Sequence, residues 1–156
     1  SNGNMVRKTL LANYPANQAN FISVPFTNCI SPEESALKYQ ELIKQTCKGN
    51  PPIFDFILLG LGDDGHTASL FPGDKVLGVK DKFVSNSIGK GIPRITFTPS
   101  LLSAARRVVF LVSGYTKRQA LERLLSEEES PDRTPAKLVR PSSEIIVLAD
   151  QSALKD

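Results

Sequence analysis

The chain has 156 residues, 40% of them hydrophobic, so it is long enough to bury the core of one domain. Its 19 basic and 16 acidic residues leave a net charge of +3 without any block of five or six like charges, and tryptophan is absent, so a nucleic-acid surface is not expected. No apolar run approaches the roughly 20 residues that a membrane-spanning helix needs, so no membrane partner is expected either.

The first clear element along the chain is a helix that begins after Ser31. Ser31 suits the N-cap position, Pro32 suits the first helical position, and Glu34 can close a capping box. Apolar side chains then recur at spacings of three and four residues: Ala36, Tyr39, Ile43 and Cys47. Gly49 follows as a stop signal. The pattern therefore predicts an amphipathic helix between Ser31 and Gly49.

Three apolar runs are typical of strands that are buried on both faces: residues 53–59, 108–112 and 144–149. Two shorter segments, residues 83–87 and 95–97, are further strand candidates. After the second long run, Thr116 and Gln119 predict another helix through a capping box. Because strands and helices alternate, the sequence predicts an α/β fold with a largely parallel sheet.

Glycine turns follow two of these strands, one after Leu59 and one after Val112. In open parallel sheets, ligands bind in the crevice beyond the carboxyl ends of the strands. We therefore expect both turns to face one pocket, provided that the two strands are neighbours in the sheet.

The first of these turns opens the segment GLGDDGHTASLFPG, which contains the formal dinucleotide pattern G-x-G-x-x-G. Two features argue against that cofactor. The carboxylates of Asp63 and Asp64 would face the pyrophosphate, and Pro72 interrupts the segment too early for a crossover helix. We therefore expect no dinucleotide at this turn.

A metal site is not expected either. Asp64 and His66 supply two ligands, His66 is the only histidine, and Cys29 and Cys47 are too far apart for a CxxC pair. Two unpaired cysteines fit a reducing compartment, so we expect the cytoplasm. A serine nucleophile is disfavoured because the chain lacks a G-x-S-x-G pentapeptide.

On these residues alone, two interpretations of His66 stay open. An imidazole beside the carboxylate of Asp64 is suited to act as a general base that takes a proton from water. The alternative is a histidine that only caps or hydrogen-bonds the turn. For Asp63 we expect a role that accepts backbone amides or faces solvent.

Two cations are candidates for anion binding. Lys117 lies in the first turn of the helix after residues 108–112, where it opposes the helix dipole unless a bound phosphate reverses that effect. Arg94 lies just before a short predicted strand and is a second candidate anion contact. For both side chains, a solvated surface charge is the alternative.

The segment GLGDDGHTASLFPG resembles the signature of the 6-phosphogluconolactonases. The similarity continues through PRITFTPSLLSAARRVVFLVSG and the lysine after it, and through the opening SNGNMVRKTLL. The related glucosamine-6-phosphate deaminases share the G-x-G-x-D-G-H core but typically continue with an A-F-N-E-P type segment, where this chain has Ser-Leu-Phe-Pro at positions 69–72. The resemblance implies a Rossmann-like α/β fold with helices on both faces of the sheet.

The resemblance also implies an activity: hydrolysis of 6-phosphogluconolactone to 6-phosphogluconate in the oxidative pentose phosphate pathway, without a metal or cofactor. His66 would activate the attacking water, and Asp64 would orient the imidazole. Lys117 and Arg94 would bind the substrate phosphate. Two glycines of the same loop, Gly62 and Gly65, are further candidates for substrate contacts. A phosphosugar lactone is the only partner that the resemblance implies.

Members of this family are longer and carry a D-E-R-x-V-P segment before the S-N-x-x-M stretch. Residues 1–156 are therefore expected to form a single α/β domain that corresponds to the C-terminal portion of a lactonase. Two alternative functions stay open: an amino-sugar-phosphate deaminase or isomerase of the same fold, and an inactive fragment that binds phosphosugars.

Overall fold

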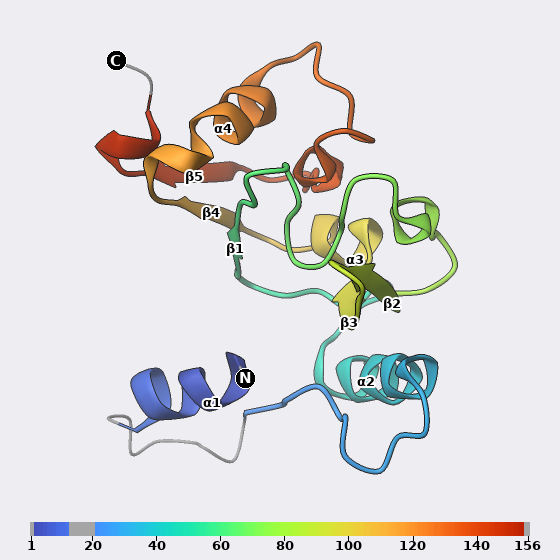
Figure 1. Cartoon of the computed structure of the whole chain (residues 1–156). Coiled ribbons are helices and arrows are strands. Elements are labelled where there is room, and N and C mark those ends of the chain that lie inside the picture. The colour runs from blue at the N-terminus through green and yellow to red at the C-terminus, as the bar shows by residue number, and fades with distance from the viewer. Residues whose placement is uncertain (1, 13–20, 155–156) are drawn as a thin grey trace.

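The computed structural model describes residues 2–12 and 21–154 (Figure 1). Its helices are α1 (Asn2–Val6), α2 (Pro32–Thr46), α3 (Pro99–Ser103) and α4 (Arg118–Leu125), and the π-helical turn η1 (Arg7–Leu11) follows α1. Its strands are β1 (Ile57–Gly60), β2 (Val84–Gly89), β3 (Ile92–Phe97), β4 (Val108–Val112) and β5 (Ile145–Ala149). The short 3₁₀ turns are η3 (Lys75–Gly78), η4 (Tyr115–Lys117), η5 (Pro135–Leu138) and η6 (Gln151–Ala153).

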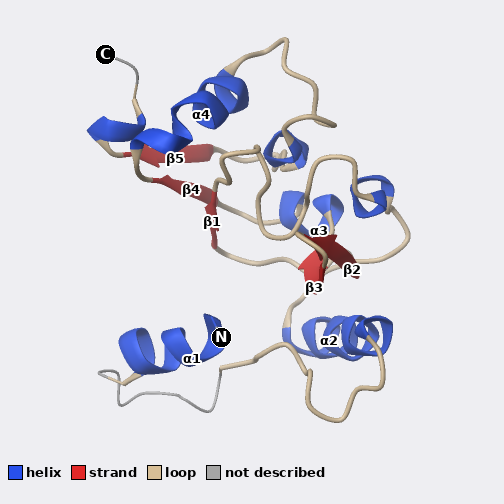
Figure 2. Ribbon diagram, viewed as in Figure 1, coloured by secondary structure: helices blue, strands red, loops and turns tan. Residues whose placement is uncertain are grey.

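The first sheet is parallel, with the strand order β1-β4-β5. Its register places Leu59 opposite Phe110, and Phe110 opposite Val147. β1 and β4 are therefore neighbours, as the pocket between their carboxyl ends requires. The predicted α/β class with a parallel sheet is confirmed, and strand and helix ribbons alternate along the chain in Figure 2.

One face of this sheet forms the main hydrophobic core. Phe110 lies at its centre and is fully buried, together with Ala120 and Leu121 of α4. Figure 1 shows α4 beside β4 and β5. Because α4 follows β4 directly, its apolar residues return onto the strand that precedes it, which is the packing expected of a strand–turn–helix unit.

The other face of the sheet is open in the described part of the chain. Leu58, Leu111 and Leu148 point to this face, and their exposed fractions are 58%, 54% and 52%. Leu111 is opposite Leu148, whereas Leu58 is opposite Val109, which is buried. Parallel sheets are ordinarily covered on both faces, so the exposed pair Leu111 and Leu148 is a candidate contact surface for a partner.

The first long apolar run starts its strand later than predicted. Instead of spanning residues 53–59, β1 begins at Ile57. The preceding Phe54 is partly buried outside the sheet. Its ring lies 5.3 Å from the ring of Phe97 in a second core cluster. Its carbonyl accepts a hydrogen bond from Arg106 N–H at 2.8 Å, which guides the chain toward the sheet without forming part of it.

The two shorter predicted strands are confirmed, but they lie outside the parallel sheet. β2 and β3 form an antiparallel hairpin around Lys90 and Gly91, whose φ angles of 52° and 74° suit a tight two-residue turn. α2 packs against this hairpin. Gln40 of α2 fixes the contact, because its Oε1 accepts from the backbone N–H groups of Phe83 at 2.8 Å and Val84 at 3.3 Å.

The start of α2 agrees closely with the sequence. The Ser31 side chain accepts from Glu34 N–H at 3.2 Å, which confirms the predicted N-cap. The Glu34 carboxylate accepts from Ile30 N–H at 2.7 Å, one residue earlier than a capping box requires.

The start of α4 differs from the prediction. The helix begins at Arg118, and no side chain caps it, so the capping box of Thr116 and Gln119 is wrong. The reason is the turn η4: Gly114 has φ +98°, and its carbonyl accepts from Lys117 N–H at 3.0 Å. Thr116 is therefore inside a 3₁₀ turn and cannot occupy the N-cap position.

Candidate active site

The carboxyl ends of β1 and β4 open onto one cavity. The cavity has a volume of about 310 Å³ and is lined by residues 58–62 together with His66, Ala68 and Lys117. His66 comes from the loop after β1, and Lys117 comes from η4 after β4. The predicted meeting of the two glycine turns at one pocket is thus confirmed, and it brings the only imidazole beside an ammonium group.

Asp64 holds the imidazole of His66. Its Oδ1 lies 2.6 Å from His66 Nδ1 and also accepts from the His66 backbone N–H at 3.0 Å. When the ring is neutral, this carboxylate can accept a hydrogen bond from a proton on Nδ1. Nε2 then keeps its lone pair.

The carboxyl group of Asp64 is suited to remain ionised. Its burial acts to raise the pKa, but hydrogen bonds from the backbone and ring of His66, with the charge of the imidazole, outweigh this effect. The pKa of Asp64 therefore lies below its ordinary value of 3.8. An ionised carboxylate on Nδ1 favours the protonated imidazole that a general base becomes during catalysis.

Gly62 allows the His66 ring to approach the loop backbone. A Cβ atom at this position would lie 2.0 Å from His66 Nδ1 and 2.7 Å from Asp64 Oδ1. Gly65 has φ +90°, and a Cβ there would lie 3.0 Å from Thr134 Cα.

The backbone N–H groups of the two glycines are used within the loop. Gly62 donates to His66 O at 2.8 Å, and Gly65 donates to Gly62 O at 3.0 Å. These glycines therefore shape the turn, and the expectation that they contact substrate gains no support from their N–H groups.

Aromatic packing fixes another side of the imidazole. The ring of Phe71 lies 4.6 Å from that of His66, with a tilt of 37°. Gly89 of β2 makes room for Phe71, because a Cβ there would come within 2.4 Å of its ring. Thr67 anchors the same loop to β1, since its hydroxyl donates to Gly60 O at 2.8 Å. Sequence reasoning did not identify Phe71 or Gly89 as functional residues.

A buried ionic cluster supports the loop from α4. Arg123 donates from Nη2 to Asp63 O at 3.2 Å and from Nε to Thr134 Oγ1 at 3.2 Å. The Thr134 hydroxyl donates to Glu129 Oε1 at 2.7 Å. The Asp63 carboxylate accepts from Asp64 N–H at 3.2 Å, so the modest role predicted for Asp63 is confirmed. The role of Arg123 was not predicted.

Arg94 lies at a different cavity from His66 and Lys117. It is on β3, opposite Ser87, and lines a cavity of about 740 Å³ together with Arg7 and Ser69. Ser69 is next in sequence to Ala68, which lines the His66 cavity, so consecutive residues line the two cavities. The structure thus brings His66, its partner Asp64 and Lys117 together at one cavity. It places Arg94 at the other cavity.

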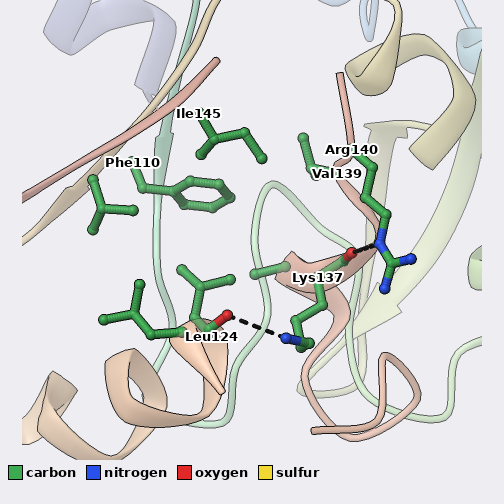
Figure 3. Close-up of a pocket in the computed structure, with 9 residues that line it drawn as sticks. Phe110, Leu124, Lys137, Val139, Arg140 and Ile145 are labelled. Atoms are coloured by element: carbon green, nitrogen blue, oxygen red, sulfur yellow. Dashed lines mark hydrogen bonds between the residues drawn. The ribbon is translucent and has the colours of Figure 1, made fainter. Parts of the chain in front are cut away.

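A further cavity of about 320 Å³ lies near the amino end of β5, around Ile145 (Figure 3). Its walls are mainly apolar, and Phe110 contributes to them. Its cations are bound to backbone carbonyls: Lys137 Nζ donates to Leu124 O at 3.3 Å, and Arg140 Nε donates to Lys137 O at 2.9 Å. It offers no acid or imidazole, so the site with reactive groups is the one around His66.

Two further observations concern the described ranges 2–12 and 21–154. In these residues, no group of three or more His, Cys, Asp and Glu side chains lies close enough to hold a metal ion. None of the helices described there has the length and apolar character needed to cross a membrane.

The fold and the site together define an α/β protein that carries an imidazole, a carboxylate and an ammonium at the carboxyl ends of two neighbouring parallel strands. The family model of glucosamine-6-phosphate isomerases/6-phosphogluconolactonase matches residues 1–148. The chain therefore belongs to this family, as the resemblance of its motifs indicated.

Individual relatives agree with this assignment. A 6-phosphogluconolactonase of Synechocystis sp. is 42% identical over 98% of this chain and 65% of its own length. The human 6-phosphogluconolactonase is 36% identical over 88% of this chain and 54% of its own length. The crystal structure of the Thermotoga maritima 6-phosphogluconolactonase superposes with a TM-score of 0.76 at 27% identity, over 92% of this chain and 62% of that one. The chain thus spans less than two thirds of the length of these relatives.

Proposed function

We propose that this chain carries the catalytic base and the phosphate-binding side chains of a 6-phosphogluconolactonase. The enzyme hydrolyses 6-phospho-D-glucono-1,5-lactone to 6-phospho-D-gluconate. The observation that carries the proposal is the 2.6 Å contact between His66 Nδ1 and Asp64 Oδ1 at a cavity that Lys117 also lines. The names of the Synechocystis and human relatives support the choice of substrate.

In the proposed reaction, His66 is the general base. Asp64 stays ionised and accepts a hydrogen bond from Nδ1–H, so His66 Nε2 takes a proton from water while the water oxygen forms a bond to the lactone carbonyl carbon. The bond between this carbon and the ring oxygen then breaks, and the proton on Nε2 passes to the ring oxygen. The steps consume one water molecule and need neither an oxidant nor a reductant.

The substrate phosphate is assigned to Lys117 and Arg94. An ammonium and a guanidinium both form charge-assisted hydrogen bonds with phosphate oxygens. Lys117 and Ala68 line one cavity, and Arg94 and Ser69 line the other, so a substrate bound to both cations would extend across the peptide between Ala68 and Ser69. Binding at both cations would hold the lactone carbonyl still beside His66, which is how positioning lowers the barrier of a reaction that also occurs in water.

The proposed setting is the cytoplasm. Cys29 and Cys47 are both free thiols, which fits a reducing compartment. The proposed partner is the phosphosugar lactone itself.

Parallel assays with two substrates test the proposed function. The chain is incubated with 6-phosphogluconolactone and, separately, with glucosamine 6-phosphate. Acid release above the spontaneous rate, without ammonia from the amino sugar, is the expected result. Ammonia release would overturn the proposal in favour of a deaminase. Phosphosugar binding without turnover of either substrate would instead favour a binding role for this length of chain.

A further inference from the structure

An aspartate outside the His–Asp pair holds the loop that follows β4. Asp150 lies just after β5, and its side chain is the acceptor for four donors. Two belong to the β4 loop: Ser113 Oγ at 2.5 Å and Gly114 N at 3.1 Å. The other two follow Asp150 itself: Ser152 Oγ and Ala153 N, both at 2.8 Å. One carboxylate therefore joins the loops at the carboxyl ends of two neighbouring strands.

These bonds lead directly to Lys117. The Gly114 N–H donates to Asp150, and the Gly114 carbonyl accepts from Lys117 N–H at 3.0 Å. On the other side of Lys117, Arg118 Nε donates to Ser152 O at 2.8 Å. The backbone of Lys117 is thus held on both sides by contacts with the segment around Asp150.

The contacts depend on the two acceptor oxygens of a carboxylate, and a neutral side chain of the same size cannot make all of them. An asparagine has one acceptor oxygen in place of two, so with its NH₂ group at the Oδ2 position Ser113 Oγ–H and Gly114 N–H both lose a contact that they make there. Hydrogen bonds from the Ser113 side chain above all, then from the Gly114 backbone and the Ser152 side chain, hold the pKa of Asp150 far below its ordinary value of 3.8.

We propose that Asp150 is a positioning residue for the phosphate site: its carboxylate fixes the Ser113–Gly114 turn and thereby sets where the Lys117 ammonium lies in the His66 cavity. The inference rests on the proposed function for its consequence in catalysis. Its structural part, that Asp150 orders an anion-binding lysine, is independent of which phosphorylated compound is the substrate.

The test compares the unaltered chain with Asp150→Asn in two measurements. In lactone hydrolysis, loss of the carboxylate raises KM about tenfold and changes kcat by less than about threefold, since Lys117 binds phosphate while His66 is untouched. In an NMR titration with inorganic phosphate, the Kd rises by a similar factor. Asp81→Asn, which removes an exposed acid far along the chain, is the matched control and leaves both quantities unchanged.

The Gly114 amide resonance reports on the contact itself. In the unaltered chain it stays constant as the pH passes 3.8 and shifts only well below that value, because a carboxyl with a lowered pKa keeps its bonds until it is protonated. In Asp150→Asn the shift is absent. If the Asn variant does not fold, Ser113→Ala removes one donor and raises the phosphate Kd by about threefold.

The outcomes separate the two proposals. An altered phosphate Kd in a chain without lactonase activity supports the positioning role and argues against the proposed function. The positioning role is overturned if the Gly114 resonance differs between Asp150→Asn and the unaltered chain while KM and the phosphate Kd are unchanged. It is also overturned if the Gly114 resonance is the same in both chains.

Discussion

Gly62 is the residue on which the geometry of the catalytic pair depends most directly. A methyl group at this position would overlap His66 Nδ1, so Gly62→Ala forces the imidazole away from Asp64. We expect kcat for lactone hydrolysis to fall about 100-fold, since a displacement of about 1 Å at reacting groups costs this much. Steady-state kinetics measure the loss, and circular dichroism checks that the fold persists.

Gly78→Ala is the control for this substitution. A Cβ at Gly78 meets no atom within 4 Å, so the activity should not change. Equal activities of the Gly62 and Gly78 variants would contradict the role given to Gly62.

At the same scale, sequence distance decided which site residues could be predicted. Asp64 and His66 are two positions apart, so their contact follows from the turn alone. The contacts of Phe71 with Gly89 and of Arg123 with Asp63 join residues far apart in sequence, and no local pattern marks them. A lone arginine in an amphipathic helix has the same pattern whether it faces solvent or supports a loop.

At the scale of elements, α4 supports the loop after β1 through Arg123. The exposed fractions of the Arg123 and Glu129 side chains are 14% and 10%. Arg123→Met leaves the Asp63 carbonyl and the Thr134 hydroxyl without this donor and removes the 3.9 Å ion pair with Glu129, so we expect the free energy of unfolding to fall by about 2 kcal/mol. Urea unfolding measures the difference.

Arg106→Met provides the comparison. Arg106 is 72% exposed and pairs with Asp55 across 3.4 Å, so its loss should change the unfolding free energy by less than about 0.5 kcal/mol. If both variants unfold at the same urea concentration, α4 does not support the loop in the way described.

The elements themselves were predicted to different degrees for physical reasons. β4 matches its apolar run residue for residue, because it is the central strand: β5 pairs along its whole length and β1 pairs with residues 108–111. Residues 53–56 belong to another largely apolar run, but they form no strand, and Phe54 packs into a second core cluster. Hydrophobicity therefore could not distinguish a strand from a core-filling loop, and it did not reveal that Leu58, Leu111 and Leu148 are exposed.

At the scale of the whole molecule, the open face of the parallel sheet is the main unpartnered surface among the described residues. We expect the chain to self-associate through Leu111 and Leu148, which are opposite each other. Leu111→Gln, on the central strand, should lower the association constant at least about tenfold and leave the unfolding free energy nearly unchanged. Sedimentation velocity over a range of concentrations measures the association.

Ile88→Gln is the control for this surface. Ile88 is 64% exposed but lies on the β2–β3 hairpin, so its replacement should not alter association. Association that responds equally to both substitutions would show that the sheet face is not the interface.

The most direct test of the account is the rate of 6-phosphogluconolactone hydrolysis above the spontaneous rate, measured for the unaltered chain and for His66→Ala. If His66 is the general base, the substitution lowers kcat by about 10²- to 10⁴-fold while circular dichroism stays the same. A His66→Ala variant that hydrolyses the lactone as fast as the unaltered chain would contradict the central claim.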